Sequence, residues 1–295
     1  MDTILLYLDL FGAAITAALI AGALCPLVGG LLLLRRAAFE GVALPQAAAA
    51  GTALGFAVLP WWVSTVGLGG LSIDEALDSP HALTGYLLGW AAVGTFVALV
   101  ALFVSGRRAE TQAARVAVLF AIASSATTLL AMASPLGGER IAALLRGEIL
   151  TIDLHDLEVL GGVYLFVAAA TLRARSLFVL VGFDPDLTRV LGHDTRRIEG
   201  TLLLLVGTTV AVGALLVGPV VLFGLLTIPP LAARGLARSL RSFYIWASGL
   251  GLGSSALGLA ISFGLDWPLG PSVVVAAGGV LGVSRAALSL REGRF

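Results

Sequence analysis

Long apolar segments alternate with short polar connections along the whole chain. Most of these segments come close to the roughly 20 apolar residues that a membrane-spanning helix needs. Nine can be counted, at about 11–34, 43–64, 83–104, 115–133, 157–172, 201–217, 219–233, 243–264 and 270–284. The pattern predicts an all-α integral membrane protein, a polytopic bundle of about eight or nine transmembrane spans, with residues 1–295 forming a single domain.

The seventh segment has the least regular pattern. It is short and ends in Thr227, Ile228, Pro229 and Pro230. Proline removes a helical hydrogen bond and its ring crowds the preceding turn, so we expect the helix to break at this point. A complete span and half a span remain alternatives for this segment.

The composition agrees with a membrane protein and excludes several functions. Hydrophobic residues make up 58% of the chain and charged residues only 12%, whereas a soluble domain is usually about a quarter charged. The formal net charge is zero, so no basic surface for nucleic acid is indicated. There is no lysine for a phosphate-binding loop, and the three histidines lie in predicted loops without catalytic spacing. We therefore expect a transport subunit in contact with membrane lipid, not an enzyme, and no cofactor bound by this chain.

The arginines predict the orientation, because positive charges next to a span are retained on the cytoplasmic side. If Arg35 and Arg36 are cytoplasmic, only Arg140 and Arg146 of the 18 basic residues fall outside, leaving 18 − 2 = 16 inside. This split predicts a multi-pass membrane protein with its N-terminus outside and its C-terminus in the cytoplasm.

An acidic outer loop contains the weak candidates for a metal site. Asp74, Asp78 and His81 offer oxygen and imidazole ligands that could attract a cation. We favour a solvated acidic loop instead, because exposed charges interact weakly through water. The stretch 153–156, with two aspartates around a histidine, is interpreted in the same way.

The connection between the first two spans has the most specific motif. Residues 35–48 read Arg-Arg-Ala-Ala-Phe-Glu-Gly-Val-Ala-Leu-Pro-Gln-Ala-Ala. This stretch resembles the zinc and manganese permeases of bacterial ABC importers, which typically show two arginines, an aromatic residue and then Gly-Asp-x-x-Ser-His-Ala. In that family the Asp and His, four residues apart, lie on one helical face and can share a divalent cation.

Four further blocks resemble the same family and follow in the same order, so the resemblance covers nearly the whole chain. They are Gly147–Leu150, Phe183–Leu187 with Val190–Glu199, Val217–Arg234, and Asp266–Ser272. Iron-chelate and vitamin permeases share some of the last three blocks and are the nearest alternative family.

The resemblance implies a place in the bacterial inner membrane, a set of partners and a mode of coupling. Two ABC ATPase subunits that use ATP and Mg²⁺, an extracytoplasmic solute-binding protein and a second permease copy, identical or related, would complete an importer. The surface segment Leu231–Leu240 would then contact the ATPase. The residues assigned to this coupling are Pro229, Pro230, Leu231, Ala232, Arg234 and Arg238.

The resemblance fails at the residues that would bind the cation. The family's Asp corresponds to Val42, its Ser to Pro45 and its His to Gln46, and neither valine nor a neutral amide is a good zinc ligand. Val42, Gln46 and Glu40 remain the candidates for the translocation path, with Thr52 as a further neutral lining group.

Several explanations of this loss stay open. In the first, the substrate is not a bare divalent cation. In the second, a different permease subunit supplies the ligands. In the third, Glu40 and the outer acidic residues hold the cation. A secondary transporter and a non-transporting accessory subunit are the alternatives outside ABC importers. Buried ionisable residues for ion coupling are scarce in the spans, which disfavours the first of these two.

Overall fold

The computed structural model describes residues 2–35, 37, 39–65, 80–104, 109–134 and 152–292. Within these ranges the chain is helical, and nine helices are long and apolar enough to cross a membrane. Each of the nine predicted segments lies in one of them, which confirms the predicted fold class. A tenth helix, α8 (Pro185–Val190), is too short to span. The nine are α1 (Asp2–Leu34, with its apolar span from Phe11), α2 (Glu40–Thr65), α4 (Pro80–Val104), α5 (Ala109–Ala133), α7 (Leu154–Phe183), α9 (Thr195–Leu216), α10 (Pro219–Leu236), α11 (Leu240–Leu265) and α12 (Leu269–Glu292).

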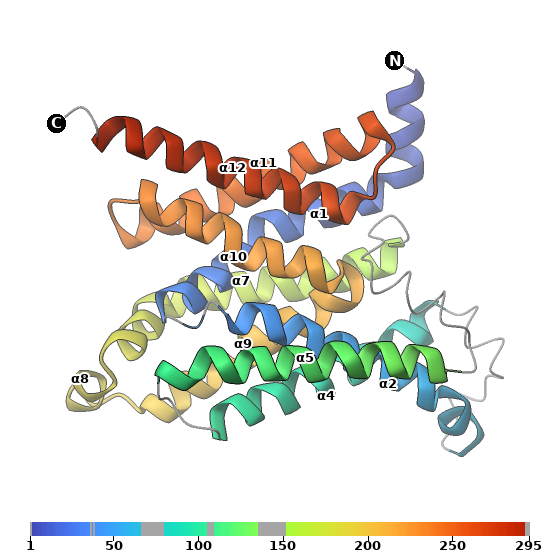
Figure 1. The fold of residues 1–295 in the computed structure, drawn as a ribbon, viewed down its shortest axis with the longest axis horizontal. Coiled ribbons are helices and arrows are strands. Elements are labelled where there is room, and N and C mark those ends of the chain that lie inside the picture. The colour runs from blue at the N-terminus through green and yellow to red at the C-terminus, as the bar shows by residue number, and fades with distance from the viewer. Residues whose placement is uncertain are drawn as a thin grey trace.

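The helices pack as two groups joined by α9 (Figure 1). In the first, the α1 group, α1 lies against α7, α10 and α11, and α12 covers α10 and α11. In the second, the α2 group, α2 lies against α4 and α5. Helix α9 contacts α2, α4 and α7, while α10 also contacts α2 directly. The groups therefore meet along α9 and along the line where α10 crosses α2.

Within each group, glycines let helix backbones touch. A Cβ atom at Gly251 of α11 would overlap the carbonyl oxygen of Gly22 in α1, and one at Gly29 of α1 would overlap the carbonyl of Leu226 in α10. In lipid, small residues allow this close approach, and van der Waals contact replaces the hydrophobic driving force. The glycine-rich sequence of the spans thus serves packing inside one chain.

Gly251→Val should destabilise the protein strongly, because the new side chain has to displace the backbone of α1. Overpacking of this kind costs about 3 kcal/mol, which corresponds to a fall of roughly 6–12 °C in the melting temperature. Gly249→Val is the matched control on the same helix, since a Cβ there has no atom within 4 Å. Fluorescence-detected size-exclusion chromatography after heating measures both variants. Equal melting temperatures would contradict the backbone contact.

The prediction that α10 breaks at its prolines is wrong. The helix continues through Pro229 and Pro230 to Leu236, so the seventh segment is a complete span of 18 residues. Both prolines are buried, and the φ angle that the ring fixes is helical, so only hydrogen bonds are lost. Prolines are tolerated inside membrane helices when neighbouring elements surround the freed backbone groups. Here α1 approaches closely enough at Gly29 to lie against the Leu226 carbonyl.

Helix α7 is longer than its apolar segment predicts. It runs from Leu154 to Phe183, and Arg173 and Arg175, which end the apolar run 157–172, lie inside it. Charged side chains near the end of a span extend to the membrane surface without interrupting the backbone hydrogen bonds. The two ends of the chain lie on opposite sides of the bundle (Figure 1), as an odd number of spans requires.

Candidate functional site

Val42 and Gln46 lie on a half-exposed stripe of α2. The stripe repeats every fourth residue, and the positions between its members are almost all buried. Spacing of four brings residues to one face of a helix, so Val42 and Gln46 lie on the same side of α2. All side chains of the stripe are uncharged. Its members are Val42, Gln46, Ala50, Leu54 and Val58.

The structure does not bring the other two lining candidates to this stripe. Glu40 begins α2 two residues before Val42, so it lies roughly 200° around the helix at 100° per residue. Thr52 is buried, and its hydroxyl donates to the carbonyl of Ala48 at 3.1 Å. The stripe therefore has one hydrogen-bonding side chain, the amide of Gln46.

The first turn of α2 lies against the middle of α10. A Cβ at Gly41 would be 3.3 Å from the methyl group of Thr227 and 3.9 Å from the Cβ of Leu226. Pro229 and Pro230 follow Thr227 by less than one turn. The start of α2 and the middle of α10, which belong to two separate sequence motifs, thus meet where the α1 and α2 groups join.

A compact turn follows α7 and contains the strongest sequence motif. The carboxylate of Asp184 accepts hydrogen bonds from the backbone N–H groups of Asp186 at 3.1 Å and Leu187 at 2.9 Å, and so caps α8. Pro185 occupies the first turn of that helix, a position where it is favoured. Gly192 closes the turn with φ of +82°, a conformation that glycine adopts without strain. These local interactions fix the shape of the turn.

Helix α8 exposes apolar side chains at this end of the bundle. Val190 is 83% exposed, Phe183 66% and Leu191 56%, and Leu187 is also exposed. Exposed apolar groups that are gathered in this way mark surfaces that bind another protein. We call these four residues, Phe183, Leu187, Val190 and Leu191, the α8 patch.

An ion pair anchors the α8 region to the rest of the bundle. A side-chain nitrogen of Arg35, at the end of α1, lies 3.7 Å from a carboxylate oxygen of Glu199 in the second turn of α9. Both side chains are largely shielded from solvent. The stem of Arg35 also packs on Gly182 near the end of α7, where a Cβ would be 2.6 Å from its Cγ. The elements before and after α8 are therefore both held against α1.

The predicted coupling segment Leu231–Leu240 does not form a separate surface helix. Its first part is the last turn and a half of α10, residues 237–239 connect the helices, and Leu240 begins α11. Arg234 and Arg238 are exposed at this corner, whereas Pro229, Pro230 and Ala232 are buried. The corner lies at the same end of the bundle as α8 (Figure 1).

Asp153 and Asp156, two of the acidic residues predicted to lie outside, have structural partners. Asp153 caps α7 by accepting from the backbone N–H of Asp156 at 2.8 Å, and Thr84 donates to the Asp156 carboxylate at 3.0 Å. Asp74 and Asp78 lie outside the described residues, and of His81 only the backbone, in α4, is described. Among the described residues no group of three or more His, Cys, Asp or Glu side chains could hold a metal ion.

Comparisons with known proteins agree with these features. The model of the ABC 3 transport family matches residues 8–286. The manganese transport system membrane protein MntC of Halalkalibacterium halodurans is 27% identical over 202 residues, 68% of this chain, although the match covers only 61% of that protein. The manganese import system permease protein ScaB of Streptococcus gordonii is 25% identical over 266 residues, which are 89% of this chain and 85% of ScaB.

Solved structures share the fold. PsaBC from Streptococcus pneumoniae, determined in complex with Fab, matches with a TM-score of 0.77 at 20% identity, covering 96% of this chain and 94% of that one. A structure described as an inward-facing conformation of a metal-chelate type ABC transporter matches with a TM-score of 0.70 at 17% identity over 93% of this chain and 85% of that one. At these identities the likeness establishes the architecture. Because the family model spans nearly the whole sequence, the chain belongs to the ABC 3 transport family, as a membrane-embedded transport subunit that is not itself an enzyme.

Proposed function

We propose that the protein is the permease subunit of a bacterial ABC importer for a metal ion or a metal-containing substrate. The observation that supports this most directly is the family match over residues 8–286. Relatives along most of the chain are named as manganese permeases, and a protein named as a chelated iron transport system membrane protein, YfeD of Yersinia pestis, is 25% identical over 46% of the chain. We infer the class of substrate from these relatives.

The passage would run along the stripe of α2, between this chain and a second permease copy. The stripe is partly exposed along α2 from Val42 to Val58, so it is available to substrate and to a second copy. Helices α5 and α12 are the least covered spans among the described residues, with 22% of each apolar window buried. They offer further surface for a second copy or for lipid.

The α8 patch would dock on the partner ATPase. Its apolar side chains project from a capped turn, and that turn is connected to α1 through Arg35 and Glu199. A rigid turn transmits displacement better than a flexible loop, because its backbone hydrogen bonds resist local rearrangement. The corner at Arg234 and Arg238 would lie beside this contact and add positive charge to it. In this arrangement the arginine-rich end faces the cytoplasm, the N-terminus lies outside and the C-terminus inside.

The uncharged stripe limits what this chain contributes to metal binding. Val42 has no donor atom, and the amide of Gln46 is a weaker ligand than a carboxylate or an imidazole. We infer that the substrate either travels as a chelate or finds its stronger ligands on a different permease subunit in a heterodimer. An extracytoplasmic solute-binding protein would deliver it in either case.

Co-expression with neighbouring ATPase and solute-binding proteins tests the proposal. The expected result is a stable complex whose ATPase activity rises when substrate-loaded binding protein is added, together with uptake of metal into vesicles. Elemental analysis of the vesicles, with the chain expressed alone or beside a second permease, separates a homodimer from a heterodimer. A complex that never contains an ATPase would overturn the importer function. A complex that binds the ATPase but transports nothing would support an accessory subunit.

A further inference from the structure

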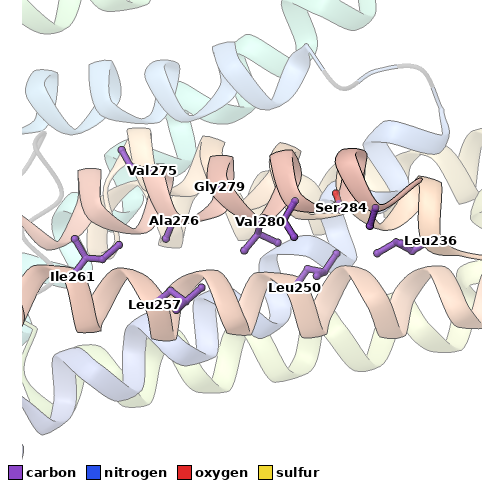
Figure 2. A pocket seen from close by; sticks show the side chains of 11 residues that line it. Leu236, Leu250, Leu257, Ile261, Val275, Ala276, Gly279, Val280 and Ser284 are labelled. Carbon is purple, nitrogen blue, oxygen red and sulfur yellow. The ribbon is translucent and has the colours of Figure 1, made fainter. Parts of the chain in front are cut away.

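A groove between α11 and α12 opens on the surface of the bundle (Figure 2). Its volume is about 640 Å³, and its lining exposes only apolar atoms. The one polar side chain in its wall, Ser284, donates its hydroxyl to the backbone carbonyl of Leu281 at 2.8 Å and has no free hydrogen to offer. The lining includes Leu236, Leu250, Leu257, Ile261, Val280 and Val283.

The groove lies along the apolar, membrane-spanning part of α12. Its positions along α12 run from Val275 to Ala287, inside the membrane-spanning part Leu269–Leu290. Twelve residues of helix extend about 18 Å, and one leaflet of the hydrocarbon core is roughly 15 Å thick. The length of the groove therefore matches a single acyl chain from one leaflet.

The two ends of the groove differ in charge. Leu236 and Ser284 lie at one end and Ile261 and Val275 at the other (Figure 2). The first end is followed by exposed arginines from all three helices around it. From residue 219 to the end of α12 there are two acidic residues: Asp266, which follows α11 on the opposite side, and Glu292, the last residue of α12. The exposed arginines are Arg234, Arg238, Arg241 and Arg285.

We propose that this groove binds a phospholipid with an anionic headgroup, whose acyl chain fills the groove while its phosphate lies among the arginines. Charge complementarity selects this occupant: clusters of arginine at the cytoplasmic end of membrane helices attract anionic headgroups. Arginine also binds phosphate oxygens with two parallel hydrogen bonds. The inference depends on the membrane-spanning fold and is independent of the transported substrate.

The shape of the groove favours a lipid chain over a helix of another protein. A helix about 10 Å across and 18 Å long displaces roughly 1,400 Å³, about twice the volume of the groove. Helix pairs in membranes also prefer faces of small residues, whereas seven of the eleven residues that line this groove are Leu, Ile or Val and four are Ala, Gly or Ser. A flexible chain fills such a hollow without leaving gaps.

Native mass spectrometry of the full chain in mild detergent tests the site. The probes are dioleoyl phosphatidylglycerol and dioleoyl phosphatidylcholine, which share their acyl chains and differ in headgroup charge. We expect one phosphatidylglycerol retained per chain, at least ten-fold more often than phosphatidylcholine. Gly279→Leu fills the groove, and a Cβ at Gly279 has no atom within 4 Å, so the fold should tolerate it. Arg238→Gln with Arg241→Gln and Arg285→Gln removes the charge instead.

Each variant has a matched control. Gly249→Leu adds the same side chain at an open position of α11 away from the groove, and Arg189→Gln with Arg196→Gln and Arg197→Gln removes three exposed arginines near α8. The groove and charge variants should each lower phosphatidylglycerol retention at least five-fold, while the controls leave it unchanged. Equal retention of both lipids, or equal loss in the controls, would overturn the proposal. So would disulfide cross-linking of Val283→Cys between two copies, because the groove would then be covered by protein.

Discussion

Replacing Val190 and Leu191 of the α8 patch by glutamate is expected to abolish recovery of the partner ATPase with the permease. Burying an apolar side chain of this size contributes about 1.5–3 kcal/mol, and the variant loses two of them and places two carboxylates in the contact. A loss of about 3 kcal/mol already weakens binding more than 100-fold. Affinity purification of the permease, with the ATPase measured by immunoblot, gives the result. The variant should itself fold normally, because both side chains are exposed.

His193→Glu is the matched control for this experiment. His193 is exposed in the same turn, so the variant adds negative charge at the same end without removing an apolar contact. It should retain most of the ATPase. Undiminished recovery with the Val190 and Leu191 variant, but loss with Arg234→Glu and Arg238→Glu, would instead assign docking to the corner between α10 and α11.

Val42→Asp combined with Gln46→His is expected to create a site for a divalent cation. The two side chains are one turn apart on a half-exposed face, so a carboxylate and an imidazole there can reach one ion from the same side. We expect zinc or manganese affinity at least ten-fold above that of the unchanged chain, because the native pair offers only one amide. Isothermal titration calorimetry of the purified protein measures it, with elemental analysis as an independent count of bound metal.

In the control, the carboxylate and the imidazole are too far apart to bind the same ion. Val42→Asp with Leu54→His keeps both substitutions on the stripe but separates them by 12 residues, about 18 Å of helix. This variant should bind zinc and manganese no better than Val42→Asp alone. If the adjacent pair also leaves zinc and manganese affinity unchanged, the stripe does not present side chains to a common ion.

The spans could be predicted from sequence because lipid imposes a simple requirement on them. Each needs a long run of apolar residues, and every run from 11–34 to 270–284 lies in a spanning helix. The errors have physical causes. The break predicted in α10 does not occur, because the packing of α1 against α10 accommodates the hydrogen bonds lost at Pro229 and Pro230. The length of α7 is underestimated, because Arg173 and Arg175 end the apolar run without ending the helix.

The candidate site was only partly visible in the sequence. Asp184, Pro185 and Gly192 are local signals for a capped turn, and such a turn is found. The stripe on α2 could not be read directly, because apart from Gln46 its partly exposed members are as apolar as the buried residues between them. In a membrane protein, hydrophobicity does not separate the face that lines a passage from the face that packs. The exposure of that face depends on where neighbouring helices lie.

The contact between Gly41 and Thr227 has a consequence for movement. Inside the α1 group, helix backbones interlock at glycines, whereas α2 meets α10 here through the methyl group of Thr227 packed against Gly41. A displacement of α2 along α10 therefore meets less backbone interlocking than a displacement between the helices of the α1 group. Val42 directly follows Gly41, so the stripe would move together with α2. With Gly41→Cys and Thr227→Cys, an added oxidant would form a disulfide only in the state in which positions 41 and 227 lie adjacent, as they do here, and the yield of that disulfide would report the state.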